Sequence, residues 1–352
     1  MQIGNHSIGP DSPPYLVMES GATHSGYASA ERITRAVAAS GAQAIKWQVV
    51  YADDLMYPDR DADVAYTNAD GQARKESMYA ALKRRELYQE QWAELCCLAH
   101  SLHLDFIATP SSERAVNTLI DMGTDAIKVA KGDQNHFKLI EYIGQAICNN
   151  APDGQLAIIL DGRERMADVN EAYDILSRFG LSDIAIMHCP SGYPSAIFGV
   201  HLAAIPLLRQ SFPDCAIGYA DHSMGYGFCR EAYVMGASVI EKTVTEDKAT
   251  DAVEHGMSLD LSELRGFVEA MTATWEAMGQ ARVVFSSRVN PSVRRGVYAA
   301  EDLWPKDEIT EKNIEFKRPE VGIPASEWQD MVGKRAIVNI RKGEAIERQY
   351  FN

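Results

Sequence analysis

Short apolar runs alternate with amphipathic segments along most of this chain. Each run has the length of a buried strand, and the segments between runs repeat apolar residues every three to four positions, as helices do. The predicted strands are Tyr15–Glu19, Ala44–Val50, Asp105–Pro110, Ala126–Ala130, Leu156–Leu160, Ile184–Cys189, Ala216–His222 and Val239–Val244. The predicted helices cover about 29–40, 88–102, 112–122, 137–148, 166–179, 198–211, 226–235 and 261–278. Eight strand–helix units predict an α/β fold, a closed parallel (β/α)8 or TIM barrel, with its chemistry at the carboxyl ends of the strands.

A long polar segment rich in aspartate follows the second predicted strand, from Tyr51 to about Ser77. We expect a loop here. Two interpretations remain open. The segment is either a lid or substrate loop above the barrel mouth, or an acidic loop that is exposed to solvent and has no role in the site.

The alternating pattern ends near residue 280. We expect a barrel over 1–280, a linker with clustered arginines over 281–292, and a compact β-rich domain over 293–352. Short strand-like runs in that domain are Gly296–Ala300, Ile309–Thr310, Ile314–Lys317 and Ala336–Ile340.

Composition and charge narrow the class of partner. The net charge of −15 disfavours nucleic acid and an anionic membrane, although local lysines can still bind an anionic substrate. The six cysteines show no CxxC spacing, which is typical of reduced cysteines in a cytoplasmic protein. Apolar runs fall far short of the ~20 residues of a membrane helix, and residues 1–14 lack the features of a signal peptide. A cytoplasmic enzyme is therefore expected.

Polar side chains stand at the end of every predicted strand. In chain order they are Glu19, Lys46, Gln48, Thr109, Lys128, Lys131, Asp161, His188, Ser191, Tyr193, Asp221, His222, Glu241 and Lys242. The carboxyl ends of barrel strands meet at one rim, so we expect these side chains to converge. Lysines, carboxylates and histidines together suit the binding of an anion and the movement of protons on a polar substrate.

Single residues in this set have competing interpretations. Lys128 and Lys46 lie inside apolar strands, where each is either a lysine that extends its amine to the strand edge or a site residue. Because an unpaired charge is costly there, a functional role is expected for both. His188 is either a hydrogen-bonded core histidine or a site residue. Asp221 could fix the tautomer of His222, which follows it at the strand exit.

Several of these segments resemble motifs of the sialic acid synthase family, which includes N-acetylneuraminate synthases and spore-coat polysaccharide protein E. The similar segments are Glu19–Gly26, Ala44–Val50, Ala108–Ser112, Ile127–Asp133, Met187–Ser195, Gly218–Ser223 and Gly236–Thr245. The tail, from Arg294 to Gly343, resembles the family's antifreeze-like SAF domain. The resemblance spans nearly the whole chain in the family's order.

The resemblance implies that phosphoenolpyruvate adds to the open-chain aldehyde of an amino sugar, water attacks C2 and phosphate leaves. The product would be a 3-deoxy-2-keto sugar acid of nonulosonate or polysaccharide biosynthesis. A divalent metal, manganese or magnesium, would polarise the aldehyde and would be bound by His222. We expect the catalytic residues to be Glu19, Lys46, Lys128 and Asp221. The expected substrate-binding residues are Gln48, Thr109, Lys131, Asp161, Ser191, Tyr193 and Arg318. The resemblance implies that Arg318 reaches the site of a partner in a domain-swapped homodimer.

The sequence departs from the family pattern at positions that the family uses to bind the metal and the phosphate. The family's second metal-binding histidine is Thr243 here, and a hydroxyl is a poorer ligand than imidazole for such ions. Three hydroxyl positions of the phosphate site are Lys131, Leu160 and Ala220, and Asp161 stands beside the second. Two alternatives therefore stay open: a lyase or aldolase acting on another keto acid through a Schiff-base lysine (Lys46, Lys128 or Lys131), and a carbohydrate-binding protein without catalysis.

Overall fold

The computed structural model describes residues 1–150, 156–162, 165–279 and 290–352. The chain divides into two compact units, Met1–Gly279 and Gln280–Asn352, and each is described by itself. Most of the expected linker, residues 281–289, lies outside the described residues. No helix in the described part of the chain has both the length and the apolar character needed to cross a membrane.

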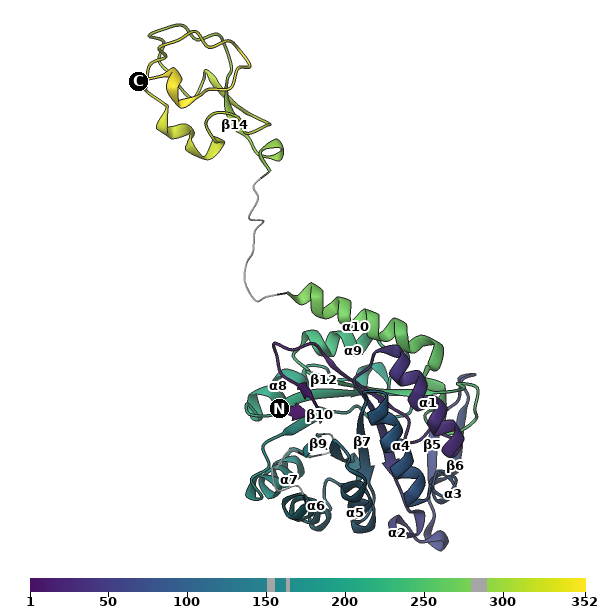
Figure 1. Ribbon diagram of the computed structural model, residues 1–352. Helices are drawn as coiled ribbons and strands as arrows, with labels where there is room; N and C mark the ends of the chain where they lie inside the picture. The colour runs from purple at the N-terminus through teal and green to yellow at the C-terminus, as the bar shows by residue number, and fades with distance from the viewer. Residues whose placement is uncertain (151–155, 163–164, 280–289) are drawn as a thin grey trace. The chain divides into compact units, whose positions relative to one another are not determined.

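A closed parallel barrel forms the core of the first unit, as predicted (Figure 1). Its strands are β3 (Tyr15–Glu19), β4 (Ala44–Val49), β7 (Asp105–Pro110), β8 (Ala126–Val129), β9 (Ala157–Asp161), β10 (Ile184–His188), β11 (Ala216–Asp221) and β12 (Val239–Thr245). Each strand pairs in parallel with the next in this order. β12 pairs with both β11 and β3 and so closes the ring.

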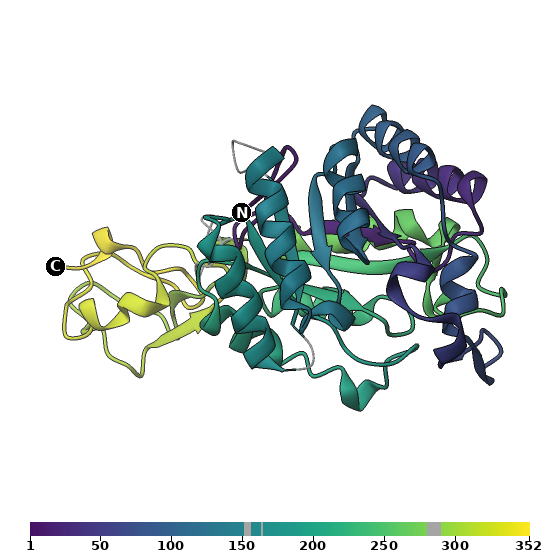
Figure 2. The same ribbon diagram turned by 90° about the horizontal axis from the view of Figure 1, so that it is seen from below.

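Helices surround these strands, as Figures 1 and 2 show. They are α1 (Tyr27–Ser40), α2 (Ala52–Leu55), α3 (Met78–Lys83), α4 (Gln89–Ser101), α5 (Glu113–Met122), α6 (Phe137–Asn150), α7 (Met166–Arg178), α8 (Ala204–Ser211), α9 (Gly227–Val234) and α10 (Leu264–Met278). Short 3-10 turns lie at Pro58–Arg60, Lys131–Asp133, Ile197–Gly199, His255–Met257, Leu261–Glu263, Pro291–Val293, Ala325–Asp330 and Arg348–Tyr350. A two-residue strand, β13 (Leu259–Asp260), pairs with the end of β12.

The period of two along each strand separates two apolar layers. On β3, Leu16 and Met18 pack outward in the layer shared with the helices. Tyr15 and Val17 face inward, in the cluster that fills the barrel. Because successive side chains alternate between the two faces, Glu19 belongs to the inward set. The same alternation decides which strand-end residues reach the site.

The expected loop between the second and third barrel strands contains regular structure. A hairpin of β5 (Asp63–Thr67) and β6 (Ala73–Ser77) follows α2, and α3 begins directly after it. Tyr66 anchors the hairpin, since its hydroxyl donates to the backbone oxygen of Asp251 over 3.0 Å. The expectation of an irregular loop was therefore wrong over these residues.

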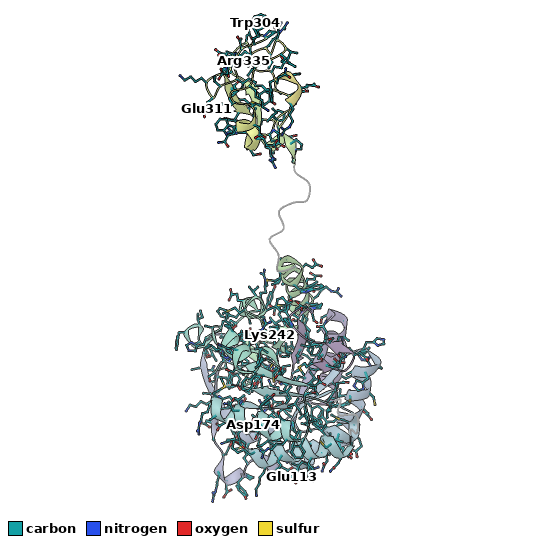
Figure 3. The ribbon with its side chains drawn as sticks, turned by 90° about the vertical axis from the view of Figure 1, so that its left-hand side faces the viewer. Glu113, Asp174, Lys242, Trp304, Glu311 and Arg335 are labelled. Atoms are coloured by element: carbon teal, nitrogen blue, oxygen red, sulfur yellow. The ribbon has the colours of Figure 1, made fainter. Side chains whose placement is uncertain are left out.

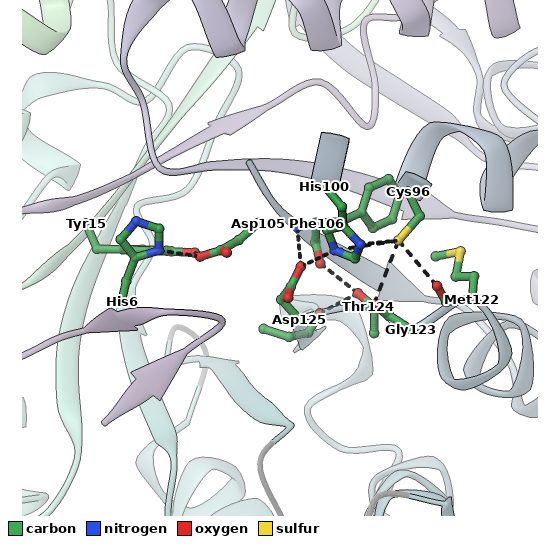
Figure 4. Close-up of polar contacts among 11 residues, drawn as sticks. His6, Tyr15, Cys96, His100, Asp105, Phe106, Met122, Gly123, Thr124 and Asp125 are labelled. Carbon is green, nitrogen blue, oxygen red and sulfur yellow. Dashed lines mark hydrogen bonds and ion pairs between the residues drawn. The ribbon is translucent and has the colours of Figure 1, made fainter. Parts of the chain in front are cut away.

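A second hairpin, β1 (Gln2–Ile3) and β2 (His6–Ser7), covers the amino-terminal end of the barrel. Ile3 packs in the inner barrel cluster. His6 Nδ1 lies 2.8 Å from Asp105 Oδ2, and the Tyr15 hydroxyl donates to the same oxygen over 2.6 Å (Figure 4). Burial raises the pKa of Asp105 despite these two bonds. The hairpin closes this end of the barrel, which leaves the opposite end for a site.

The second unit has a small core of its own. Its antiparallel strands are β14 (Gly296–Ala299) and β15 (Ile314–Lys317), as the sequence indicated. The expected strand at Ala336–Ile340 is reduced to isolated bridges, Ala336 with Phe351 and Leu303 with Ile340. Trp304, Glu311 and Arg335 are labelled on this unit in Figure 3.

Candidate active site

A cavity of about 360 Å³ lies at the carboxyl ends of the barrel strands. It is lined by Glu19, Lys46, Gln48, Met78, Thr109, Lys128, Ala130, Lys131, Gly132, Asp161, Cys189, Tyr193, His222, Glu241 and Glu254. Side chains from all eight barrel strands or the loops that follow them therefore meet with others in one space. A second hollow of about 590 Å³ runs along the β5–β6 hairpin and shares Tyr193 with this cavity.

Two buried lysines and three buried carboxylates form a connected network in the cavity. Lys128 Nζ lies 2.8 Å from Glu241 Oε1 and 3.1 Å from Asp161 Oδ1. Lys46 Nζ lies 3.3 Å from Glu19 Oε1 and 3.6 Å from Glu241 Oε1. The charges expected inside these strands are thus paired, as their burial requires.

This network fixes the charge state of its central lysine. Burial alone would lower the Lys128 pKa, but the carboxylates of Asp161 and Glu241 outweigh burial and raise that pKa above its usual value. Both lysines likewise outweigh burial at Glu241 and lower its pKa. Burial raises the pKa of Asp161, and Lys128 only partly opposes this. Lys128 is therefore held as an ammonium ion, whereas a Schiff-base nucleophile must be a neutral amine.

Asp221 does not line the cavity. It shares its strand face with Tyr219, which packs in the outer layer. Its Oδ2 lies 2.9 Å from Lys242 Nζ, with both side chains fully buried, and the Tyr219 hydroxyl donates to Oδ1 over 3.0 Å. Figure 3 labels Lys242 within the barrel unit. Lys242 Nζ also donates to the backbone oxygen of Ser223 over 2.6 Å, so the pair braces the turn that carries His222.

His222 faces the cavity in its neutral form. Burial lowers its pKa to about 4. Its ring packs against Tyr193 with 5.1 Å between centroids. The Nδ1 atom is buried and has no hydrogen-bond partner among the described residues. A neutral imidazole with one open nitrogen can contact a ligand.

The donors around His222 do not meet the needs of the divalent metal that the family resemblance implies. No group of three or more His, Cys, Asp or Glu side chains is arranged to hold a metal ion within the described ranges. Thr243, at the position of the expected second histidine, is a buried hydroxyl. Glu241 is already neutralised by Lys46 and Lys128. These residues therefore do not fit a resident metal.

Glu254 is a cavity residue that the strand-end analysis missed. It lies in the loop after β12, just before a 3-10 turn, with φ of 72° and 9% of its surface exposed. Burial, followed by the charge of Glu19, raises its pKa to about 8. The available signal in the sequence was a carboxylate directly beside a histidine, Glu254 and His255, in the segment after the last predicted strand.

The remaining expected residues lie elsewhere. His188 faces away from the cavity, and its Nε2 donates to the Val200 carbonyl over 2.7 Å. Ser191 is exposed on the loop after β10 and does not line the cavity. Arg318 is an exposed residue of the second unit. The Tyr193 carbonyl accepts from the Thr67 N–H over 2.9 Å, so the β5–β6 hairpin supports this wall of the cavity.

Comparisons with known proteins agree with this architecture. The N,N'-diacetyllegionaminic acid synthase of Legionella pneumophila is 28% identical over 340 residues, covering 94% of this chain and 93% of the relative. The pseudaminic acid synthase of Campylobacter jejuni is 25% identical over 354 residues, covering 100% of both. The solved structure of the spore coat polysaccharide biosynthesis protein spsE from Bacillus subtilis shares the fold, with a TM-score of 0.66, 24% identity and coverage of 100% of this chain and 99% of that one.

Two family models match the two units in turn. The SAF domain matches residues 294–347, which confirms the expected nature of the tail. The NeuB family matches residues 33–283, which is most of the barrel unit. With its barrel, its strand-end cavity and these matches, the chain belongs to the NeuB family.

Proposed function

We propose that this protein is a synthase of nonulosonate sugar biosynthesis that joins phosphoenolpyruvate to the aldehyde of an amino sugar. The observation that carries the proposal is the single cavity in which Glu19, Lys46, Lys128 and Glu241 meet at the barrel mouth. Relatives named as legionaminic and pseudaminic acid synthases support the sugar class.

Two lysines of the cavity, Lys128 and Lys131, provide positive charge for an anionic substrate. Lys131 follows β8 and lines the cavity beside Lys128. Lys128 shares its charge with Asp161 and Glu241, so it attracts a phosphate less strongly than an unpaired lysine would. Lys131, which stands where the family has a hydroxyl, brings a further cationic side chain to the cavity lining.

The uncharged polar residues suit the sugar. Gln48 and Thr109 face the cavity from β4 and β7, and Tyr193 covers it from the loop after β10. Hydroxyl and amide groups of this kind recognise sugar hydroxyls by hydrogen bonds. Glu19, held beside Lys46, is positioned to accept a proton from the attacking water.

Asp221 acts in this proposal as a positioning residue. It accepts from the Ser223 N–H over 2.9 Å, and Lys242 binds the Ser223 carbonyl, so the pair orients the turn with His222. Arg318 is proposed to complete sugar binding, contributed to a partner's cavity in a domain-swapped homodimer.

Phosphate release tests the proposal. The purified full-length protein is incubated with phosphoenolpyruvate and a panel of hexosamines and their acetylated derivatives, and released phosphate and product mass are measured. We expect one aldose to give equimolar phosphate and a keto acid. Lys128→Met should abolish turnover, while Lys138→Met, at an exposed site on α6, serves as the matched control.

Other outcomes identify the alternatives. Trapping of a keto acid by borohydride would indicate the Schiff-base lyase and contradict the condensation. Sugar binding without turnover, weakened by Arg318→Ala but not by Lys128→Ala, would indicate a carbohydrate-binding protein.

A further inference from the structure

One carboxyl group in the cavity stands outside the lysine–carboxylate network. The Glu254 side chain is nine-tenths buried, and no hydrogen bond or ion pair holds its carboxyl group within the described ranges. A buried polar group without a partner is costly, so its retention in a cavity calls for a ligand or a chemical role.

The backbone at Glu254 adopts a strained conformation that its neighbours hold in place. Its φ of 72° is unusual for a residue with a side chain. The Val253 N–H donates to Glu76 Oε1 of β6 over 2.9 Å, and the Ser258 hydroxyl donates to the Glu254 carbonyl over 2.7 Å. The segment is thus fixed on both sides, and the carboxyl group is presented to the cavity.

Charged groups from four directions face this carboxyl group. They are Glu19 of β3, Lys46 of β4, Arg85 after α3 and Glu241 of β12. The two carboxylates and the burial favour a neutral acid, and together they outweigh Lys46 and Arg85, so the pKa rises to about 8. At neutral pH, Glu254 therefore carries a proton that it can donate.

We propose that Glu254 is the general acid that protonates the sugar's aldehyde oxygen, in place of a resident divalent metal. The inference rests on the proposed condensation and assigns the group that activates its electrophile. It follows from two observations about the same cavity: the donors near His222 do not fit a metal, and an unpartnered carboxyl group faces the substrate space.

The proton balance closes without an added reagent. As C3 of phosphoenolpyruvate bonds to the aldehyde carbon, the C=O π bond breaks and its oxygen takes the Glu254 proton. Water then adds to the cationic C2 and releases a proton, which returns to the Glu254 carboxylate directly or through Glu19. Last, the C2–O bond to phosphate breaks and its electron pair leaves with the phosphate. The new C2 hydroxyl gives its proton to that departing oxygen, and C2 becomes a ketone. Glu254 ends the cycle protonated.

Steady-state kinetics of the full-length protein test this role, with the aldose found active above. Glu254→Gln keeps the shape of the protonated carboxyl group but cannot donate this proton. We expect kcat to fall about 100-fold or more. Wild-type kcat/KM should decline above about pH 8, and Glu254→Asp should keep a shifted form of this limb. Glu276→Gln, at an exposed position on α10, is the matched control.

Two readouts do not depend on turnover. Infrared difference spectra between wild type and Glu254→Gln should show a protonated carboxyl group at pH 7 that ionises near pH 8. Titration of the wild type with Mn²⁺, followed by electron paramagnetic resonance, should show no saturable site, and a chelator should leave activity unchanged.

The contrary results are distinct. Activity of Glu254→Gln within about threefold of wild type, or an ionised Glu254 at pH 7, would overturn the acid role alone. Saturable Mn²⁺ binding that is lost in His222→Ala would also overturn it. Absence of turnover in the wild type with every aldose would instead overturn the proposed condensation.

Discussion

Lys242 and Asp221 form an ion pair of 2.9 Å between two side chains that are completely buried. The pair lies on the outer face of neighbouring strands β11 and β12, beside Tyr219 and Cys229, and not in the cavity. It links a strand-end motif to the barrel's stability, because the same two residues also bind Ser223 in the turn that follows β11.

Lys242→Met should be strongly destabilising, since it leaves the Asp221 charge buried without its cation. We expect the free energy of unfolding to fall by about 3–5 kcal/mol. The double variant Asp221→Asn/Lys242→Met should recover much of this loss. Urea denaturation measures both, with exposed Lys138→Met as the control. Equal stability of the single variant and the wild type would contradict this account of the pair.

Asp161→Asn should strengthen the binding of phosphoenolpyruvate. Asp161 takes part of the Lys128 charge over 3.1 Å, and its amide variant would release that charge toward the phosphate. Lys128 stays paired with Glu241, so the fold should tolerate the change. We expect the Kd to fall about tenfold, or ~1.4 kcal/mol. Calorimetric titration is the measurement, and Asp174→Asn on the exposed face of α7 is the control. Weaker binding would show that Asp161 itself helps to hold the ligand.

Glu254→Gln should raise the stability of the barrel at neutral pH. The folded state raises the Glu254 pKa to about 8, well above its value in an unfolded chain, so folding favours the protonated form. In the wild type, the contribution of Glu254 to the free energy of unfolding is fully present below about pH 4.5. It is lost progressively as the pH rises to about 8. Glutamine does not ionise, so the variant does not lose stability in this way. The difference in free energy of unfolding between variant and wild type should therefore grow over the same range, to an upper limit of roughly 3 kcal/mol at pH 7. Urea denaturation at several pH values measures the difference, and a gap that does not change with pH would contradict the assignment.

Tyr15→Phe should weaken the closed end of the barrel without affecting catalysis. The Tyr15 hydroxyl donates to Asp105 at the end opposite the cavity (Figure 4). Losing a bond to a buried carboxylate should cost about 1.5–3 kcal/mol, and kcat/KM should stay unchanged. Thermal unfolding and steady-state kinetics check the two statements. Tyr142→Phe, whose hydroxyl bonds Asn117 at the surface, should change the unfolding free energy by less than about 0.5 kcal/mol. A large change in kcat/KM would mean that the two ends of the barrel are coupled.

The barrel was predictable because its strands are buried on both faces and read as continuous apolar runs. The same runs also show which strand-end residues face the cavity, because residues two positions apart lie on the same face of a strand. Glu19, Lys46, Lys128 and Glu241 share their strand faces with inward apolar residues such as Val17, Ala44, Ala126 and Val239. Asp221 shares its face with outward Tyr219, so counting in steps of two along β11 would have removed it from the catalytic candidates.

Loop residues were not accessible to that rule. Glu254 lies in a segment without periodicity, and its burial depends on Glu76 and Tyr66 of a hairpin far away in sequence. The hairpin itself was missed because β6 is largely exposed and polar, so its sequence lacks the alternation of a half-buried strand. Long-range contacts, rather than local pattern, determine both features.

The β5–β6 hairpin has a consequence for how this protein can change its substrate. Through Thr67 it supports the Tyr193 wall, and through Glu76 and Tyr66 it supports the segment that bears Glu254. An insertion or exchange within this one surface element would move two walls of the cavity together, while the barrel strands and their paired charges stayed as they are. Selection for a new sugar, in nature or in the laboratory, can therefore act on a hairpin that contributes no strand to the barrel.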